Sequence, residues 1–287
     1  MTSGGLDLDL PGAGVRLRAT RWPGAGTPVL LLHGLASTRH IWDLVVPGLS
    51  GLPLLAVDQR GHGESERPEG PYDGQAVVAD LLTALDAVGL SRVVVVGHSW
   101  GAWTALRLAA AAPERVLAVV CVDGGTLRMR DAGLSREAVR EQLTPPRVAV
   151  PPDELPGLLR SGQHASWWSP AVEAVKLSLF AVGDDGLARA RLPFDAHMAI
   201  VDDLLDTDLE AVLPEVRCPA WLVSCSPDSA RADALDRTAA LLANPRALRW
   251  DGAVHDVPLQ WPSLVAGLVR AAADEVSAAP AGEGLRP

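Results

Sequence analysis

Arg92-Val-Val-Val-Val-Gly97-His98-Ser99-Trp100-Gly101 is the stretch that decides the fold. Four consecutive valines are typical of a strand that is buried on both faces, as in a parallel sheet. The G-x-S-x-G pentapeptide then interrupts the apolar run, and the Ala- and Leu-rich residues 102–112 predict a helix. A strand, a Gly-flanked turn and a helix form the context in which a nucleophilic serine projects above a sheet. Ser99 would lie at the N-terminus of that helix, where free N–H groups favour a developing negative charge.

Length and composition bound the class of protein. The chain has 287 residues, of which 48% are hydrophobic, so it can bury a large core. A net charge of −10 gives no electrostatic reason to bind nucleic acid or an anionic membrane. No apolar run approaches the length of a membrane span, and the N-terminus lacks the basic and apolar regions of a signal peptide. We therefore expect a cytoplasmic protein that acts on a small molecule, without nucleic-acid or membrane partners and with an undefined oligomeric state.

The cysteines indicate neither disulfides nor a metal site. Cys121, Cys218 and Cys225 are odd in number and lie in apolar segments, which favours buried free thiols. Their spacing matches no zinc pattern. The sequence therefore predicts no metal and no cofactor.

Predicted strands alternate with predicted helices over most of the chain. Strands are expected at residues 6–10, 15–22, 28–32, 52–57, 93–96, 115–122, 219–224 and 247–250. The first two alternate apolar and polar residues around a Pro-Gly turn, which is typical of an antiparallel hairpin. The other strands are short apolar runs, separated by predicted helices such as residues 41–49, 74–88, 231–243 and 263–276. This alternation predicts a parallel sheet that is covered by helices on both faces.

The alternation fails between Thr126 and about Pro214. This region contains five closely spaced prolines, several aromatic residues and short helical stretches such as residues 135–143 and 169–180. We interpret residues 125–214 as a helical cap insertion, because the α/β alternation resumes after it. The α/β core would then comprise residues 1–124 and 215–277, and the Pro/Gly-rich residues 278–287 would form a disordered tail.

One histidine stands out as a general base for the serine. A serine hydroxyl is a poor nucleophile until a base takes its proton, and a third group must orient that base. Of the seven histidines, His33, His62 and His98 belong to loop motifs that already explain them. His255 instead lies in a loop of small residues between the last predicted strand and the last predicted helix. We therefore predict that His255 is the base.

Two aspartates are candidates for the acid that orients His255. Asp228 follows the strand after the insertion, and Asp123 follows the strand before it. Both would lie at the carboxyl ends of parallel strands, where ligands bind in open α/β sheets. A chain order of serine, late acid and histidine favours Asp228, and Asp123 is the alternative. The polar loop of residues 58–65 is predicted to be structural.

These segments together resemble the α/β-hydrolase fold family over nearly the whole chain. The residues that carry the resemblance are His33-Gly34, Asp58-Gln-Arg-Gly-His-Gly-Glu-Ser65, Gly97-His-Ser-Trp-Gly101, Cys218-Pro219 through Asp228, and Gly252-Ala-Val-His255. The resemblance implies an α/β fold with a mostly parallel eight-stranded sheet, helices on both faces and a helical cap inserted after the sixth strand. It also implies an oxyanion hole that is formed by the backbone N–H groups of Leu35 and Trp100.

The resemblance further implies a serine hydrolase that works through a Ser-His-Asp triad and an acyl-enzyme. Serine at position 99 argues against the haloalkane dehalogenases and epoxide hydrolases of this fold, which use an aspartate nucleophile. The predicted substrate-binding residues are Trp103, Trp167, Trp168, Phe194 and His197. They suggest a small, largely apolar ester, lactone or thioester as substrate. A non-hydrolytic binding or receptor protein of the same fold, an acyltransferase, a carbon–carbon bond hydrolase and an aminopeptidase are the alternatives.

Overall fold

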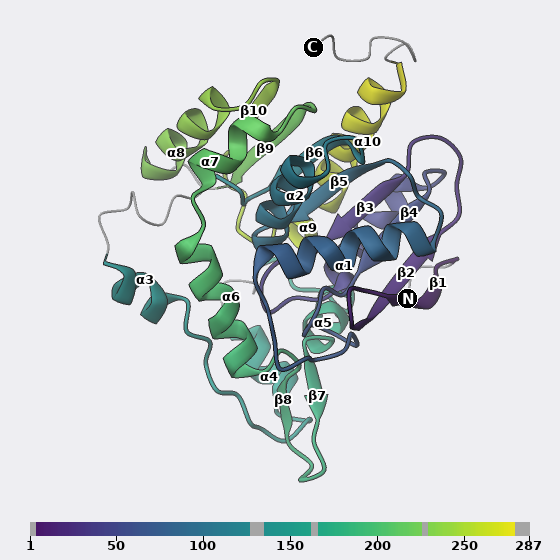
Figure 1. Cartoon of the computed structure of the whole chain (residues 1–287). Coiled ribbons are helices and arrows are strands. Elements are labelled where there is room, and N and C mark those ends of the chain that lie inside the picture. The colour runs from purple at the N-terminus through teal and green to yellow at the C-terminus, as the bar shows by residue number, and fades with distance from the viewer. Residues whose placement is uncertain (1–3, 127–134, 162–165, 226–228, 279–287) are drawn as a thin grey trace.

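One mixed sheet of eight strands forms the centre of the molecule (Figure 1). The computed structural model describes residues 4–126, 135–161, 166–225 and 229–278. The sheet has the strand order β1-β2-β4-β3-β5-β6-β9-β10. Its strands are β1 Leu6–Pro11, β2 Arg16–Trp22, β3 Val29–Leu32, β4 Leu54–Val57, β5 Val93–His98, β6 Val116–Val122, β9 Ala220–Cys225 and β10 Pro245–Trp250.

The direction of the strands follows the hydrophobic pattern of the sequence. β1 and β2 pair antiparallel, and β2 is also antiparallel to β4. All other neighbours in the sheet are parallel. Every residue of β3, β4 and β5 is buried, as expected for strands that are covered on both faces. The predicted fold class, a mostly parallel eight-stranded sheet, is confirmed.

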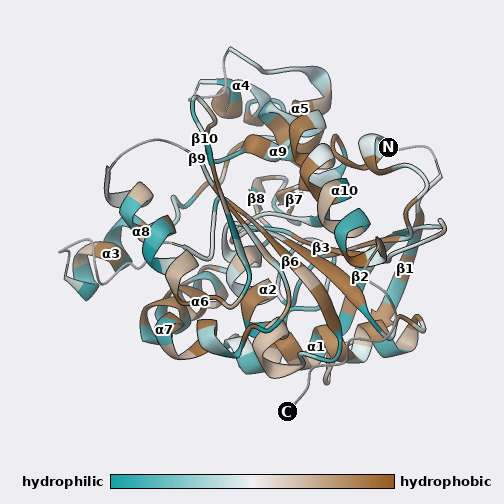
Figure 2. Ribbon diagram, turned by 90° about the horizontal axis from the view of Figure 1, so that it is seen from above, coloured by the Kyte–Doolittle hydropathy of each residue, from teal (hydrophilic) through white to brown (hydrophobic). Residues whose placement is uncertain are grey.

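Two hydrophobic clusters lie on opposite faces of the sheet. On one face, Val93 and Val95 of β5 pack with helices α1 (Gly74–Ala87) and α2 (Trp100–Ala111). On the other, Val94 and Val96 pack with α10 (Pro262–Ala278) and the short helix α9 (Val257–Gln260). Successive side chains of a strand point to opposite faces, so the four valines contribute to both clusters. Figure 2 shows that hydrophobic residues dominate the strands between these helices.

We call the residues between β6 and β9 the cap segment, and most of its elements lie in the lower half of Figure 1. Their elements are α3 Arg136–Gln142, α4 Leu155–Arg160, α5 Pro170–Leu177, β7 Phe180–Val182, β8 Ala188–Ala190, α6 Phe194–Asp206 and α7 Leu209–Val212. β7 and β8 form an antiparallel pair that the sequence did not predict. A 3-10 turn, Leu213–Glu215, ends the cap segment, and the core also contains α8 (Ser229–Ala240) and two 3-10 turns, Arg39–Trp42 and Val46–Leu49.

The two longest helices of the cap segment are anchored differently. The apolar side chains of α5, Val172 and Val175, are buried in the same cluster as α9 and α10. On α6, Ile200 and Leu204 join the cluster of α1 and α2. The opposite face of α6 joins a small separate cluster with Val139 of α3. α3 therefore meets the core through α6 and through Leu35, which packs against the same small cluster.

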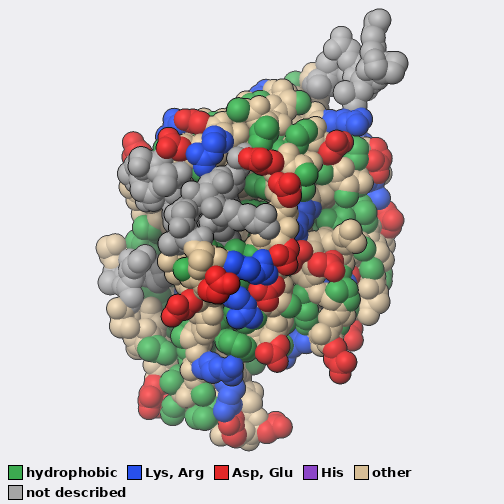
Figure 3. Space-filling model, turned by 60° about the vertical axis from the view of Figure 1, so that its left-hand side comes forward, with side chains coloured by type: hydrophobic (Ala, Val, Ile, Leu, Met, Phe, Trp, Pro, Cys, Tyr) green, Lys and Arg blue, Asp and Glu red, His purple; other side chains and the backbone are tan. Residues whose placement is uncertain are grey.

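The surface carries charges of both signs. On the face drawn in Figure 3, basic and acidic side chains are interspersed rather than segregated. Exposed ion pairs such as Arg136–Asp206 and Arg140–Asp202 join α3 to α6. Within the described residues, no helix is long and apolar enough to cross a membrane.

Candidate active site

Ser99 occupies a strained turn between β5 and α2. Its backbone has a φ of 54° and a ψ of −119°, a conformation that side-chain-bearing residues rarely adopt. Glycines on both sides make the turn possible. A Cβ on Gly97 would lie 2.1 Å from the Gly101 carbonyl oxygen, and a Cβ on Gly101 would lie 2.4 Å from the Leu32 carbonyl oxygen. Close backbone packing therefore holds Ser99 at the end of β5.

His255 lies between Ser99 and Asp123. Its Nδ1–H donates a hydrogen bond of 2.6 Å to Asp123 Oδ2. This bond places the proton on Nδ1, so that Nε2 can accept a hydrogen bond from the Ser99 hydroxyl, 3.0 Å away. The His255 side chain is 54% exposed, whereas that of Asp123 is 6% exposed. The three groups thus form a continuous chain from a buried carboxylate to an accessible hydroxyl.

Asp123 follows β6 and is fixed from two sides. Its Oδ1 accepts a hydrogen bond of 2.8 Å from the Cys225 N–H. Its backbone has a φ of 46°, a left-handed conformation that aspartate and asparagine tolerate better than most residues. A Cβ on the following Gly124 would lie 2.1 Å from the Ser99 carbonyl oxygen, so this glycine permits close packing against the serine turn. Asp228, the acid that chain order favours, lies outside the described residues.

A buried histidine holds the loop that carries His255. His98 Nε2–H donates a hydrogen bond of 2.7 Å to the His255 carbonyl oxygen. Burial and the neighbouring His255 lower the pKa of His98 to about 4, so this side chain is neutral near pH 7. Gln260 accepts a hydrogen bond from the Val254 N–H and donates one to the Gly252 carbonyl oxygen. The loop therefore has fixed contacts on both sides of His255.

Leu35 and Trp100 are the predicted oxyanion residues. Both line a cavity that lies beside the Ser99 side chain. The backbone before Leu35 is held by His33, whose Nδ1–H donates to the Gly34 carbonyl oxygen. Gln59 donates its N–H to His33 Nε2 over 3.0 Å and its side-chain amide to the His33 carbonyl oxygen over 2.8 Å. Sequence reasoning did not identify this contact of Gln59, because nothing in the local pattern reveals the partner of a residue 26 positions away.

A cavity of about 270 Å³ opens beside Ser99 and His255. Most of its wall is apolar, and the carboxylate of Asp123 is the charged group among its described lining residues. Its lining residues are Leu35, Ser99, Trp100, Trp103, Asp123, Gly124, Thr126, Leu143, Leu204, Ser224, Ala234 and His255. The cap segment contributes Leu143 and Leu204, which no sequence motif marks.

Of the five predicted substrate-binding residues, Trp103 lines this cavity and the others do not. Trp167 and Trp168 pack against the cluster of α9 and α10. Phe194 stacks with the Arg147 guanidinium, 4.0 Å from its ring centre. His197 donates its Nε2–H to the Leu143 carbonyl oxygen over 2.8 Å, so it supports the wall of the cavity without lining it.

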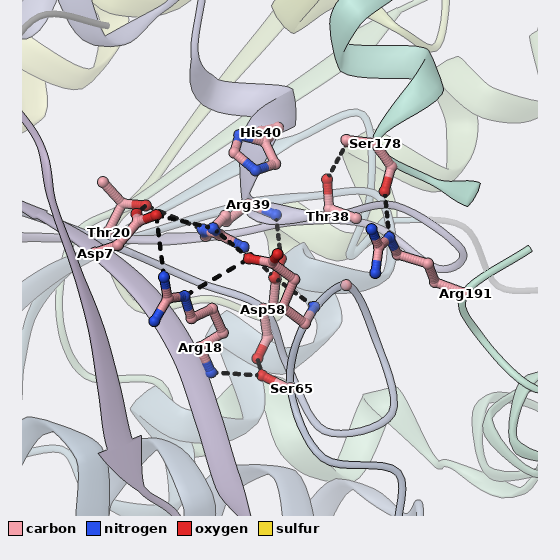
Figure 4. Close-up of polar contacts among 12 residues, drawn as sticks. Asp7, Arg18, Thr20, Thr38, Arg39, His40, Asp58, Ser65, Ser178 and Arg191 are labelled. Carbon is pink, nitrogen blue, oxygen red and sulfur yellow. Dashed lines mark hydrogen bonds and ion pairs between the residues drawn. The ribbon is translucent and has the colours of Figure 1, made fainter. Parts of the chain in front are cut away.

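The polar loop after β4 forms a separate network around the buried Asp58 carboxylate, which we call the Asp58 cluster (Arg18, Arg39, Asp58, Glu64 and Ser65); all of its members except Glu64 are labelled in Figure 4. Asp58 is fully buried and accepts hydrogen bonds from the Arg39 backbone and guanidinium, at 2.6 and 2.5 Å. Ser65 donates to the Asp58 carbonyl oxygen and accepts from the Arg18 N–H. These contacts tie the loop to β2 and to the turn after β3, as a structural loop would.

The cysteines and other potential metal ligands are dispersed. Cys121 and Cys225 are buried, Cys218 is half-buried, and the three cysteines form no disulfide with one another. Burial raises the pKa of Cys218 to about 11, which disfavours the reactive thiolate. Across the described ranges, no group of three or more His, Cys, Asp or Glu side chains is arranged to hold a metal ion.

Comparison with known proteins gives consistent matches. The model of the alpha/beta hydrolase fold family matches residues 27–165. Epoxide hydrolase A of Mycobacterium tuberculosis is 40% identical over 149 residues, which are 49% of this chain and 40% of that protein. Esterase Rv0045c of the same organism is 44% identical over 108 residues, 37% of this chain and 36% of that protein. These sequence matches therefore span 40% or less of each relative's own length.

Solved structures extend the similarity to most of the chain. The crystal structure of esterase Rv0045c superposes with a TM-score of 0.72 at 26% identity, and covers 94% of this chain and 91% of that one. E-2-(acetamidomethylene)succinate hydrolase has a TM-score of 0.80 at 22% identity, over 94% of this chain and 99% of that one. The family model, the strand order of the sheet and the serine turn after β5 all indicate the same fold. The chain has the α/β-hydrolase fold.

Proposed function

We propose that this protein is a serine hydrolase in which Ser99 is the nucleophile, His255 the general base and Asp123 the orienting acid. The observation that carries the proposal is the chain of hydrogen bonds from Asp123 Oδ2 through His255 to Ser99 Oγ, with lengths of 2.6 and 3.0 Å. This chain ends at a cavity large enough for a small acyl group. It has the order of groups that serine hydrolases use on unrelated folds.

The proposed reaction has two halves. In the first, His255 Nε2 takes the Ser99 proton while Oγ attacks the carbonyl carbon, and the carbonyl oxygen becomes an oxyanion. The N–H groups of Leu35 and Trp100 stabilise that charge. The C–O or C–S bond then breaks, His255 gives its proton to the leaving group, and the acyl group stays on Ser99. In the second half, His255 activates water, which releases the carboxylic acid and restores the serine.

The geometry supports Asp123 as the acid in place of Asp228. Chain order alone favours Asp228, because many members of this fold carry the acid late in the chain. Asp123 is instead 2.6 Å from His255 Nδ1, and its second oxygen is fixed by the Cys225 N–H. A carboxylate in this position holds the Nδ1–H tautomer and stabilises the imidazolium that forms during the reaction.

The lining of the cavity supports a small, uncharged acyl group. The indole of Trp103 and the side chains of Leu143 and Leu204 provide an apolar wall. Asp123 brings negative charge, and no Lys or Arg occurs among the described lining residues to bind a substrate carboxylate. We therefore propose a small neutral ester, lactone or thioester as substrate, with the remaining predicted aromatic residues serving the packing of the cap segment.

Epoxide hydrolysis is the second candidate, because epoxide hydrolase A is among the matching relatives. Ser99 argues against it, since epoxide hydrolases of this fold use an aspartate at the nucleophile position. Turnover of a simple epoxide such as styrene oxide, with no turnover of p-nitrophenyl esters, would favour the second candidate over the first.

A fluorophosphonate probe tests the proposal directly, because it phosphonylates only an activated serine. The parent protein should carry the adduct on Ser99, located by mass spectrometry after digestion. Ser99→Ala and His255→Ala should both lose it, since the first removes the nucleophile and the second its base. A folded parent that remains unlabelled and hydrolyses no p-nitrophenyl acetate or butyrate would overturn the proposal in favour of a binding protein.

A further inference from the structure

The end of helix α5 in the cap segment reaches the loop that carries His255. Lys176, which is the single lysine of the chain, places its Nζ 2.7 Å from Asp256 Oδ2. The two side chains are only 14% and 18% exposed, so solvent screens this ion pair weakly. Asp256 directly follows His255 in the chain. The ion pair therefore connects the cap segment to the residue next to the proposed base.

This contact complements the one that the core makes to the same short segment. His98 holds the carbonyl oxygen of His255 over 2.7 Å. Lys176 holds the next side chain, that of Asp256, from the cap segment. The peptide between His255 and Asp256 is thus contacted from the core on one side and from the cap segment on the other.

The same end of α5 also contacts the loop that carries Leu35, one of the predicted oxyanion residues. Ser178, which follows α5, donates its hydroxyl to the Val175 carbonyl oxygen, so its oxygen accepts the hydrogen bond of 2.8 Å from Thr38 (Figure 4). Thr38 is buried and lies three residues after Leu35. Arg191 donates its Nε–H to the Ser178 carbonyl oxygen and braces this turn from the other side.

Helix α5 can hold the two loops in place because its own apolar side chains are packed into the core. Val172 and Val175 are almost completely buried, in the same hydrophobic cluster as Val257 and Leu259 of α9. α9 begins two residues after His255. Apolar packing and the two polar contacts therefore come from the last two turns of α5 and the residue that follows it.

We propose that the C-terminal end of α5 is a positioning element, in which Lys176 aligns the His255 loop and Ser178 aligns the loop of Leu35. This inference rests on the proposed serine hydrolase function. Lys176 touches neither substrate nor the reacting atoms, and it acts through Asp256. A misplacement of the base by about 1 Å costs up to roughly a hundredfold in rate, so loss of the ion pair is expected to slow catalysis without abolishing it.

The test measures the inactivation rate constant and the binding constant of the fluorophosphonate probe for a set of variants of the full chain. Lys176→Met keeps the apolar stem and removes the charge, and we expect the inactivation rate constant to fall about tenfold with probe binding unchanged. Asp256→Asn should have a similar effect. The double variant should be no slower than either single variant, because the two residues act as one unit. Lys176→Arg should restore at least half of the lost rate.

Two further variants serve as a control and as an independent test. Arg160→Met removes a different ion pair of α5, the one between Glu173 of α5 and Arg160 of α4. Because Arg160 is 56% exposed, this variant should leave the inactivation rate constant unchanged. Ser178→Ala tests the second contact independently and should slow labelling about threefold, even if Lys176→Met fails to fold.

The outcomes separate the inference from the function. A labelled parent whose folded Lys176→Met and Asp256→Asn variants react within twofold of it would overturn the positioning role and leave the hydrolase function intact. Independent, multiplying effects of the two substitutions would also overturn it. A parent without an adduct on Ser99 would overturn the proposed function and, with it, this inference.

Discussion

Two polar clusters lie at the carboxyl edge of the same sheet and use similar residue types, but only one of them has groups available for chemistry. In the Asp58 cluster, both carboxylate oxygens of Asp58 are occupied by Arg39, and the residue is fully buried. In the second, which we call the Ser99 cluster (Ser99, Asp123 and His255), the buried carboxylate contacts an imidazole that is 54% exposed.

The difference lies in what each carboxylate is paired with. A guanidinium stays charged at every accessible pH, so the Arg39–Asp58 pair can only hold structure together. An imidazole can gain and lose a proton near neutral pH, and His255 has the Ser99 hydroxyl on its other nitrogen. Residue types at a sheet edge therefore do not identify a site unless one of the partners can exchange a proton beside a cavity.

The comparison is tested most strongly by Asp123→Asn. Asparagine tolerates the left-handed backbone of residue 123, so the fold should persist while the orienting charge is lost. The hydrolysis rate of a p-nitrophenyl ester should fall on the order of 10⁴-fold. Asp228→Asn is the matched control, for which a change of less than about tenfold is expected. The reverse pattern would show that Asp228 is the acid.

A change in the Asp58 cluster should affect stability instead. Asp58→Asn removes the fully buried carboxylate from the Arg39 guanidinium, which is 3% exposed and keeps only the half-exposed carboxylates of Glu64 and Asp7. The free energy of unfolding, measured by urea titration, should fall by about 3–5 kcal/mol. A loss below about 1 kcal/mol would mean that Glu64, which also contacts Arg39, compensates for the missing charge.

The buried histidines around the site predict how stability depends on pH. Burial lowers the pKa of His33 and His98 to about 4 and that of His62 to about 3, from an ordinary value of 6.5. Between pH 6.5 and about 4 the unfolded chain therefore binds protons that the folded chain does not, and stability is lost as the pH falls through this window. At pH 5.0 each histidine should cost about 2 kcal/mol relative to pH 7.5.

Urea titrations at the two pH values check this prediction. The variant His98→Asn should lose part of the pH dependence, since one of the three buried imidazoles is gone. A free energy of unfolding that is the same at pH 7.5 and 5.0 would contradict it.

The smallest effect is expected for an ion pair on the surface. Arg136 and Asp206 are 42% and 68% exposed, so their attraction is largely screened. Arg136→Met should lower the free energy of unfolding by less than about 1 kcal/mol. If Arg136→Met lowered the free energy of unfolding as much as Asp58→Asn does, burial could not explain why the Asp58 cluster stabilises the fold.

The sequence predicted the sheet well because buried parallel strands are short apolar runs with clear ends. All eight strands were expected, and the hairpin of β1 and β2 followed from its alternating pattern. The strands β7 and β8 were missed, since three residues are too few for a period to be read. The predicted helix at residues 41–49 is two 3-10 turns, because Pro47 lacks the N–H that a continuous α-helix requires.

The proposed site was predictable where it depends on local motifs and not where it depends on distance. Ser99 and His255 follow from the turn after a valine strand and from a loop before the last helix. The contact that favours Asp123 as the acid joins it to His255, 132 positions away, so no local motif reveals it. Leu143 and Leu204 come from separate helical parts of the cap segment, so no spacing in the sequence joins them to Ser99.

The burial of α5 in the core cluster limits how this protein can be recombined with its relatives. A chimera that exchanged the whole cap segment would remove Val172 and Val175 from the packing around α9 and α10. It would also remove Lys176 from Asp256. Substrate range is therefore best altered by grafting the segments that carry Leu143 and Leu204 while α5 is retained as part of the host scaffold.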